Sequence, residues 1–251
     1  METTVGIERE RFIVRLSDGM IVPAIKDLLP TVQVVAQKRG MLPELFGYEL
    51  FAGQIEDRTP PCRSLEDLKN ALIINDQILG EASFRDGLSF NFTEFAEESQ
   101  ITELVVNPFD RRHQKIWESI SSERRLAASR VAAIHVHVAV VDTNIAIKLL
   151  GLCNDNMIEY LSKIGDHSDG KRLLAYRTMS QSKGTPPKFS TGDDLLEYIR
   201  EHGGERDVWD LVRYKSKTRT VEFRMFGTTE DVNEIIRYAE ACLALYRISL
   251  K

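Results

Sequence analysis

The amino-acid sequence predicts an α+β fold, in which helices pack on one face of an antiparallel sheet. Three observations lead to this prediction. Several short segments alternate apolar and polar residues, and turn-forming residues join some of them at hairpin spacing. Longer segments combine helical apolar periodicity with capping residues. Their order along the chain is not the regular alternation of strand and helix that is typical of parallel sheets.

About six strands are expected. Residues 5–16 alternate, turn-forming residues follow at 17–19, and residues 20–22 return, which indicates a hairpin. A strand at residues 48–59 ends at two consecutive prolines. The later strands are expected at residues 88–95, 134–142, 208–214 and 220–226.

Five or six helices are expected between these strands. The clearest signal follows Ser64, which can cap a helix that has Glu66 and Asp67 in its first turn and Leu68 and Leu72 on its apolar face. The other helices are expected at residues 25–39, 111–120, from about 144 onward, 191–202 and 230–246, and a further helix at 122–128 is left open.

One stretch lacks a clear pattern. Residues 165–188 contain "GDHSDGKR" and "SQSKGTPPK", and their glycine, serine and proline content predicts a flexible loop that could close over an active site. Because 251 residues suit one large domain, we expect residues 1–251 to form a single domain.

Composition limits the class of protein. The formal net charge of -5 argues against a nucleic-acid partner or an anionic membrane surface. The three cysteines are widely spaced and odd in number, which argues against a disulfide framework or a zinc cluster and favours a reducing cytoplasm. No apolar signal segment or membrane span is expected.

Three predicted strands carry polar residues two positions apart. This spacing places both side chains of a pair on the same face of a strand. If the three pairs share the sheet face that helices leave open, they form a polar patch there. The pairs are Glu8 with Glu10, His135 with His137, and Glu222 with Arg224.

Two further acids, Glu49 and Glu56, lie in the strand expected at residues 48–59. Their odd separation requires a bend between them if both are to face the patch, and Gly53 is a natural place for one. Neighbouring carboxylates repel each other unless a cation lies between them, and carboxylates with an occasional histidine suit Mg²⁺ or Mn²⁺. The pattern therefore indicates a metal site.

Magnesium held by carboxylates often also holds nucleotide phosphates, whose oxygens arginines neutralise. Arg177, Arg213 and Arg224 are the candidates for this role. Each polar pair also has an ordinary structural explanation: a solvated strand face, a hydrogen-bonded core histidine or a cross-strand salt bridge. Periodicity alone leaves the metal site and the structural explanation both open.

Six short motifs occur in a fixed order along nearly the whole chain, and together they resemble the type 2 glutamate–cysteine ligase, or carboxylate–amine ligase, family. The motifs are "VGIERERF" at residues 5–12, "YELFAGQIEDRT" at 48–59, "IHVHVAVVD" at 134–142, "AYRT" at 175–178, "GTPPKF" at 184–189 and "TVEFRMF" at 220–226.

The resemblance implies a glutamine-synthetase-like catalytic domain: a curved, mostly antiparallel sheet with an open concave face that binds ATP and divalent metals. It implies an ATP-dependent ligase that activates a carboxylate as an acyl phosphate, which an amine then attacks. The implied ligands of one Mg²⁺ are Glu10, Glu49 and Glu56, and those of the ion nearest the ATP phosphates are Glu8, His135 and Glu222. The resemblance implies that His137 lies beside the nucleotide. It also implies that Arg224, Arg177 and Arg213 contact the carboxylate substrate or the transferred phosphoryl group. Arg213 would lie close to the nucleotide as well.

The sequence departs from the family pattern at Ala139, where glycine is usual, and at Gly227, where aspartate is usual. We therefore expect small-molecule substrates, an amino-acid-like acid and an amine, other than glutamate and cysteine. Two alternatives stay open: phosphotransfer to a carboxylate or guanidino group, and a non-catalytic nucleotide-binding protein. A homo-oligomer is also open.

Overall fold

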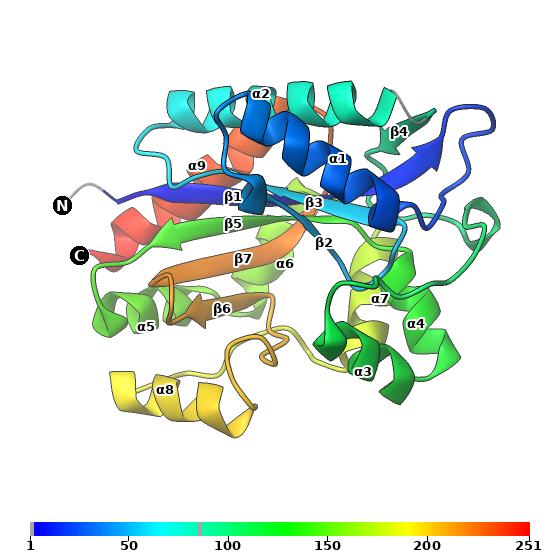
Figure 1. The fold of residues 1–251 in the computed structure, drawn as a ribbon. Helices are drawn as coiled ribbons and strands as arrows, with labels where there is room; N and C mark the ends of the chain where they lie inside the picture. The colour runs from blue at the N-terminus through cyan, green and yellow to red at the C-terminus, as the bar shows by residue number, and fades with distance from the viewer. Residues whose placement is uncertain (1–2, 85–86) are drawn as a thin grey trace.

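A computed structural model describes residues 3–84 and 87–251 of the chain. Its centre is an antiparallel sheet with the strand order β2-β3-β1-β5-β7-β6, and β4 pairs with the second half of β1 (Figure 1). The strands are β1 (Val5–Arg15), β2 (Phe46–Tyr48), β3 (Gln54–Arg58), β4 (Leu88–Asn91), β5 (Ala133–Ala139), β6 (Val212–Lys215) and β7 (Thr220–Gly227).

The pairing register brings the polar residues of different strands together. Glu8 on β1 lies opposite His135 on β5, and His137 lies opposite Glu222 on β7. Glu10 lies opposite Glu56 on β3. Because residues that face each other across an antiparallel pair project to the same side, these strands present one continuous polar face.

Helices cover the opposite face of the sheet. Five of them pack on the apolar residues that alternate with the polar ones, such as Ile7, Val136 and Phe223, which are at most 1% exposed. These helices are α1 (Ile25–Lys38), α2 (Leu65–Phe84), α5 (Thr143–Leu152), α6 (Asp155–Ile164) and α9 (Val232–Ser249).

The remaining helices leave the polar face open. α3 (Arg111–Ser119), α4 (Ser122–Ser129) and α7 (Lys171–Ser180) gather at one end of the sheet, and α8 (Gly192–Glu201) lies beyond the β6 edge (Figure 1). They frame the polar face instead of covering it. Two short 3-10 turns, Pro43–Leu45 and Glu98–Gln100, complete the described elements.

A buried ionic network ties α2 to the sheet on the helix-covered side. Arg9 and Arg11 alternate with the acids of β1 and are 0% and 2% exposed. Their guanidinium groups lie 3.1 and 2.8 Å from the Asp57 carboxylate on β3, and 2.8 and 2.7 Å from Asp76 on α2. Asn75 adds a hydrogen bond of 2.9 Å to Asp57. The sequence analysis did not anticipate this network.

The predicted α+β fold with an open antiparallel sheet is confirmed, although the described residues hold seven strands and nine helices, more than expected. The expected strand at residues 48–59 is a hairpin of β2 and β3. The expected flexible loop at residues 165–188 contains α7, so its central part is helical.

The three cysteines are free and buried. In the described part of the chain, no helix has both the length and the apolar character needed to cross a membrane.

Candidate active site

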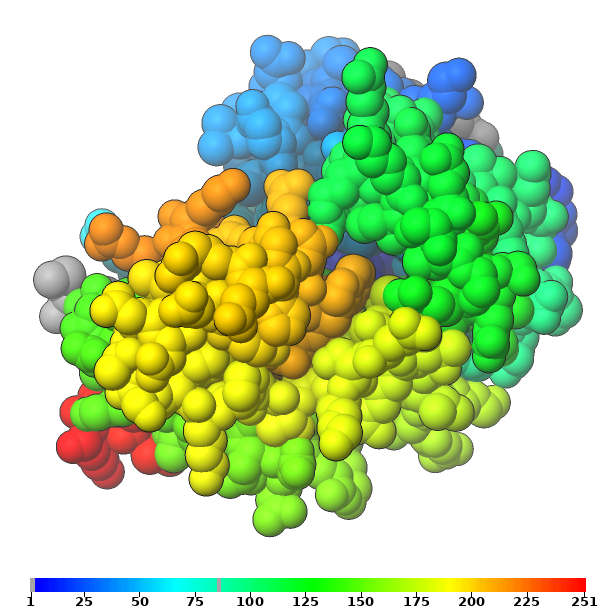
Figure 2. Space-filling model, turned by 90° about the horizontal axis from the view of Figure 1, so that it is seen from below, coloured from blue at the N-terminus to red at the C-terminus, as the bar shows by residue number. Residues whose placement is uncertain are grey.

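The open face of the sheet forms the floor of a cavity of about 720 Å³, the main cavity. Its walls come from α3, α4, α7 and the segment at residues 202–211. Figure 2 shows the hollow between the α3–α4 region, in green, and the segment that leads to β6, in gold and orange. Six of the predicted metal ligands line this cavity, and His137 lies against one of them, Glu8. These seven residues are called the acid cluster: Glu8, Glu10, Glu49, Glu56, His135, His137 and Glu222.

Glu10, Glu49 and Glu56 form one group, in which a carboxylate oxygen of each lies within 4.8 Å of the others. The hairpin of β2 and β3 makes this possible, because the chain reverses at residues 49–53 and carries Glu49 back beside Glu56. Gly53 lies at this turn, and a Cβ there would come within 2.5 Å of the Phe51 ring. The bend expected at Gly53 is confirmed.

Burial and mutual repulsion keep this group partly protonated. Burial, and then the charge of Glu56, raises the pKa of Glu10 to about 8. Burial, and then Glu10, raises the pKa of Glu49 to about 7. The Glu10 carboxylate also accepts a hydrogen bond of 2.8 Å from the Ala133 backbone N–H. Three crowded carboxylates with raised pKa values are typical of a site that holds a cation.

Both histidines contact Glu8. The Glu8 Oε2 atom lies 3.3 Å from His135 Nδ1 and 3.3 Å from His137 Nε2. His135 also lies 3.5 Å from Glu222 Oε1 and 3.5 Å from Glu10 Oε1, so it stands at the centre of the cluster. Two further groups with ligand atoms within 4.8 Å result: Glu8 with His137 and Glu222, and Glu8 with Glu56 and His135.

The histidine environment favours the neutral imidazole at the centre. Burial lowers the pKa of His135 to about 4, so its ring is neutral near pH 7 and free to bind a metal. Burial opposes ionisation of Glu8 and Glu222, but neighbouring cationic groups outweigh it: the pKa of Glu8 is lowered by His137, and that of Glu222 by Arg213.

Two of the three predicted arginines lie at the cluster. Arg213 on β6 binds Glu222 with nitrogen–oxygen distances of 2.7 and 3.2 Å. Arg224 on β7 lies 3.4 Å from Glu222 and donates a hydrogen bond of 2.9 Å to the Tyr176 hydroxyl. Its guanidinium also faces the rings of Tyr176 and Trp209, at 5.4 and 5.7 Å from their centroids. Both arginines therefore project a positive charge into the cavity.

The third predicted arginine, Arg177, is not brought to the acid cluster. It is exposed and lines a different cavity, between α6 and α7. The reason is the helical phase of α7: Arg172 and Tyr176, four residues apart, share the face that lines the main cavity, and Arg177 follows about 100° around the helix. Arg172 therefore takes the place at the cavity that was assigned to Arg177.

Arg58 is a further residue that the sequence analysis missed. It lies two positions after Glu56 on β3, forms an ion pair with Glu56, and places its Nε atom 3.5 Å from Glu8 Oε1. Its side chain is 41% exposed, more than the carboxylates that it contacts. The same two-residue spacing that identified the other pairs points to Arg58.

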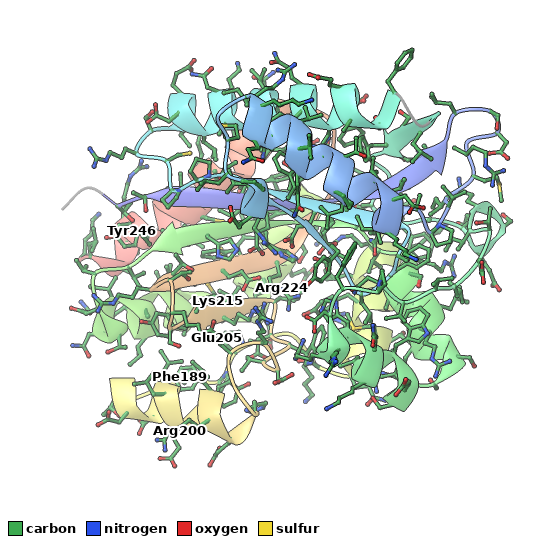
Figure 3. The ribbon with its side chains drawn as sticks, viewed as in Figure 1. Phe189, Arg200, Glu205, Lys215, Arg224 and Tyr246 are labelled. Atoms are coloured by element: carbon green, nitrogen blue, oxygen red, sulfur yellow. The ribbon has the colours of Figure 1, made fainter. Side chains whose placement is uncertain are left out.

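The segment at residues 202–211 closes one side of the cavity. Arg112 on α3 pairs with Asp207 and donates a hydrogen bond of 3.2 Å to the Arg206 carbonyl. The neighbouring residue Glu205 lies 3.9 Å from Lys215 on β6 (Figure 3). The cavity thus lies between α3 and the β6 edge of the sheet, with this segment bridging them.

The donor set of the acid cluster fits divalent magnesium or manganese. Carboxylate oxygens dominate, histidine nitrogens are the minority, and none of the free cysteines belongs to the three groups. The raised pKa values of Glu10 and Glu49 follow from burial and from the neighbouring carboxylates, and a bound cation would relieve this repulsion.

An open antiparallel sheet, helices on its other face and an acid-lined cavity together define the glutamine-synthetase-like class of folds. Solved structures agree. A bifunctional glutathione synthetase from Pasteurella multocida matches 99% of this chain with a TM-score of 0.56 and 15% identity, over 40% of its own length. Plasmodium falciparum glutamine synthetase matches 98% of the chain with a TM-score of 0.51 and 8% identity, over 52% of its length.

Sequence comparison identifies more specific relatives than the structural comparison does. The Rubrobacter xylanophilus protein named "Putative glutamate--cysteine ligase 2-1" is 27% identical over 96% of this chain and 65% of its own length. The Rhodopirellula baltica protein named "Putative glutamate--cysteine ligase 2" is 24% identical over 98% of the chain and 69% of its length. No protein-family model matches the chain.

The chain is thus similar to type 2 glutamate–cysteine ligases over most of its length, and the predicted resemblance is confirmed. It spans about two thirds of the length of these relatives.

Proposed function

We propose that this protein is an ATP-dependent ligase that joins a carboxylate to an amine through an acyl phosphate, with an amino-acid-like acid as substrate and residues 1–251 as a single catalytic domain. The observation that carries the proposal is the acid cluster: five carboxylates and the His135 imidazole line one cavity beside Arg213 and Arg224, and His137 contacts Glu8. The similarity to proteins named as ligases supports it at the level of the family.

The acid cluster would hold two divalent cations. Glu10, Glu49 and Glu56 are the proposed ligands of one ion. Glu8 and Glu222 are proposed for the other, with His135 as the nitrogen ligand and His137 beside the nucleotide. Bound Mg²⁺ would neutralise the phosphate oxygens of ATP and so remove the repulsion between the substrate carboxylate and the γ-phosphate.

The arginines would supply fixed positive charge. Arg224 is held by Glu222 and the Tyr176 hydroxyl, and Arg213 by Glu222, so neither has to reorganise when an anion enters. Preorganised guanidinium groups stabilise the charge that spreads over the phosphoryl oxygens during transfer. Arg172 lines the same cavity and is proposed in place of Arg177.

The walls of the cavity would protect the product of the first step. An acyl phosphate reacts with water unless water is excluded. Trp209 and the neighbouring residues 202–211 form one wall, and the Arg112–Asp207 ion pair joins this wall to α3. This segment is our candidate for the lid.

The proposal is tested by ADP release from a panel of acids and amines. A ligase releases ADP at a sustained rate only when both substrates are present, whereas a phosphotransferase needs the phosphate acceptor alone. Glu49→Gln should lower the rate by at least about 100-fold, and Glu240→Gln, an exposed substitution on α9, should leave it unchanged. Calorimetry that detected no binding of ATP with Mg²⁺ would refute the proposal.

A further inference from the structure

Gly227, the last residue of β7, has no side chain because Glu94 fills the space that one would occupy. A Cβ built on Gly227 would lie 1.5 Å from Glu94 Oε2 and 2.8 Å from Glu94 Cβ. Gly227 is not among the residues with positive φ, so its backbone conformation does not require glycine. Glycine is required at position 227 because any side chain there would collide with Glu94.

Glu94 is a buried acid that enters this space from another part of the chain. Its side chain is 2% exposed, and its backbone carbonyl accepts a hydrogen bond of 3.0 Å from the Ala132 N–H. The nearest cationic group is Arg172 on α7, whose Nε atom lies 3.9 Å from Glu94 Oε2. A buried carboxylate needs such a partner, since burial without one is costly.

Arg172 connects this acid to the main cavity. It is only 3% exposed and donates a hydrogen bond to the Met225 carbonyl. It lines the main cavity and also the cavity between α6 and α7. Glu94 does not line the main cavity but a different one, beside β4 and the start of α7. The Glu94–Arg172 pair therefore lies between these two cavities.

We propose that Glu94 is a positioning residue that holds the Arg172 guanidinium toward the main cavity, where it binds the carboxylate of the acid substrate, and that Gly227 supplies the space for the Glu94 carboxylate. The substrate part of this inference rests on the proposed ligase function, whereas the charge pair does not. A carboxylate borne by residue 227 would enter the same volume, so the chain can supply this acid from either position.

Moving the acidic side chain from position 94 to position 227 tests whether both positions can place a carboxylate beside Arg172. Glu94→Ala removes the acid, and Glu94→Ala with Gly227→Asp returns an acid to the same volume. The matched control, Glu94→Ala with Gly227→Ala, fills the space without charge. We expect the Asp double variant to unfold at a midpoint about 3 °C or more above the Ala double variant. Arg172→Met in both backgrounds should abolish this difference, because it removes the cation.

This unfolding experiment needs no enzymatic activity, so its outcome is independent of the proposed function. Equal unfolding midpoints for the two double variants would refute the proposed charge pair between Glu94 and Arg172. A difference in midpoint that persists with Arg172→Met would refute it as well.

Kinetics then test the positioning role. Glu94→Ala should raise KM for the acid substrate at least about tenfold and change KM for ATP less than about twofold, and the Asp double variant should recover most of the loss. A merely structural role would lower stability without a selective change in KM for the acid, and this result would refute positioning. If the wild-type protein binds Mg²⁺ and ATP but releases no ADP with any acid and amine, the proposed ligase function is wrong, and so is the proposal that Arg172 binds the substrate carboxylate. The unfolding comparison would still test the Glu94–Arg172 charge pair.

Discussion

Glu8 lies directly opposite His135 in the antiparallel pairing of β1 and β5, and His135 Nδ1 is 3.3 Å from Glu8 Oε2. The same carboxylate oxygen lies 3.3 Å from His137 Nε2. One acid thus links both histidines of the strand. Glu8 therefore belongs to two of the three groups of candidate metal ligands, one with each histidine.

The first prediction concerns the two histidines. His135→Gln should weaken Mn²⁺ binding at least about tenfold, because this residue lies at the centre of the cluster and has a neutral ring at neutral pH. His137→Gln should have a smaller effect on Mn²⁺ and a larger effect on ATP. Calorimetric titrations with each ligand measure both. His167→Gln, at an exposed position outside the main cavity, is the control. Equal effects of the two cluster variants on both ligands would contradict the assignment.

The second prediction concerns pH. Folding raises the pKa of Glu10 to about 8 and that of Glu49 to about 7, so the folded chain retains protons that the unfolded chain releases. The two acids alone would lower the free energy of unfolding by roughly 6 kcal/mol as pH rises from about 5 to 8. The lowered pKa of His135 acts in the opposite direction and offsets about 2 kcal/mol, so a net fall of roughly 4 kcal/mol is expected. Mg²⁺ should reverse the fall, since it replaces these protons.

Urea unfolding at a series of pH values, with and without Mg²⁺, measures this dependence. Glu49→Gln removes one of the titrating groups and should flatten the curve, whereas Glu240→Gln on α9 should leave its slope unchanged. A metal-free stability that rises between pH 5 and 8 would show that the acid group is not protonated as expected.

Sequence periodicity was sufficient to place the polar pairs on one face of each strand. Glu8 with Glu10, and Glu222 with Arg224, follow from the two-residue repeat of a strand alone. The register that sets Glu8 opposite His135 could not be predicted in this way, because it depends on pairing between strands more than 120 residues apart in sequence. The family resemblance implied that Glu8 and His135 share a metal ion, but it did not give the register.

The arginines show where periodicity failed. Glycine, serine and proline at both ends of residues 165–188 concealed a helix of ten residues, α7. Because no helix was predicted there, the sequence did not show which arginine faces the cavity, and Arg177 was assigned to it instead of Arg172. Glu94 could not be identified at all, since its role depends on the space left by Gly227, far away in sequence.

The third prediction tests the corrected assignment. Arg224→Met should lower kcat/KM at least about 100-fold, because it removes a charge-assisted contact in a buried site and leaves Glu222 with one partner fewer. Arg177→Met, on the exposed face of α7, should change it less than about twofold. Measuring ADP release for both variants tests this assignment. A similar loss of kcat/KM in the two variants would mean that Arg177 does act in the active site.

The fourth prediction concerns the ionic network beneath the sheet. Asp57 is 1% exposed and accepts ion pairs from Arg9 and Arg11, which are themselves buried. Asp57→Asn keeps the shape of the side chain but leaves the two guanidinium groups with Asp76 as their acid. Removing one partner of a buried ion pair typically costs about 3–5 kcal/mol, so the free energy of unfolding should fall by that amount.

Urea denaturation of Asp57→Asn gives this value directly, and Asp67→Asn, an exposed acid in the first turn of α2, is the matched control with an expected change below about 0.5 kcal/mol. Because Arg9 and Arg11 point away from the main cavity, the variant should still bind Mg²⁺ and ATP while folded. A loss of binding in the folded variant would mean that the network also sets the position of Glu8 and Glu10, the residues that alternate with these arginines on β1. A change in stability as small as that of the control would mean that Asp76 alone compensates both guanidinium groups.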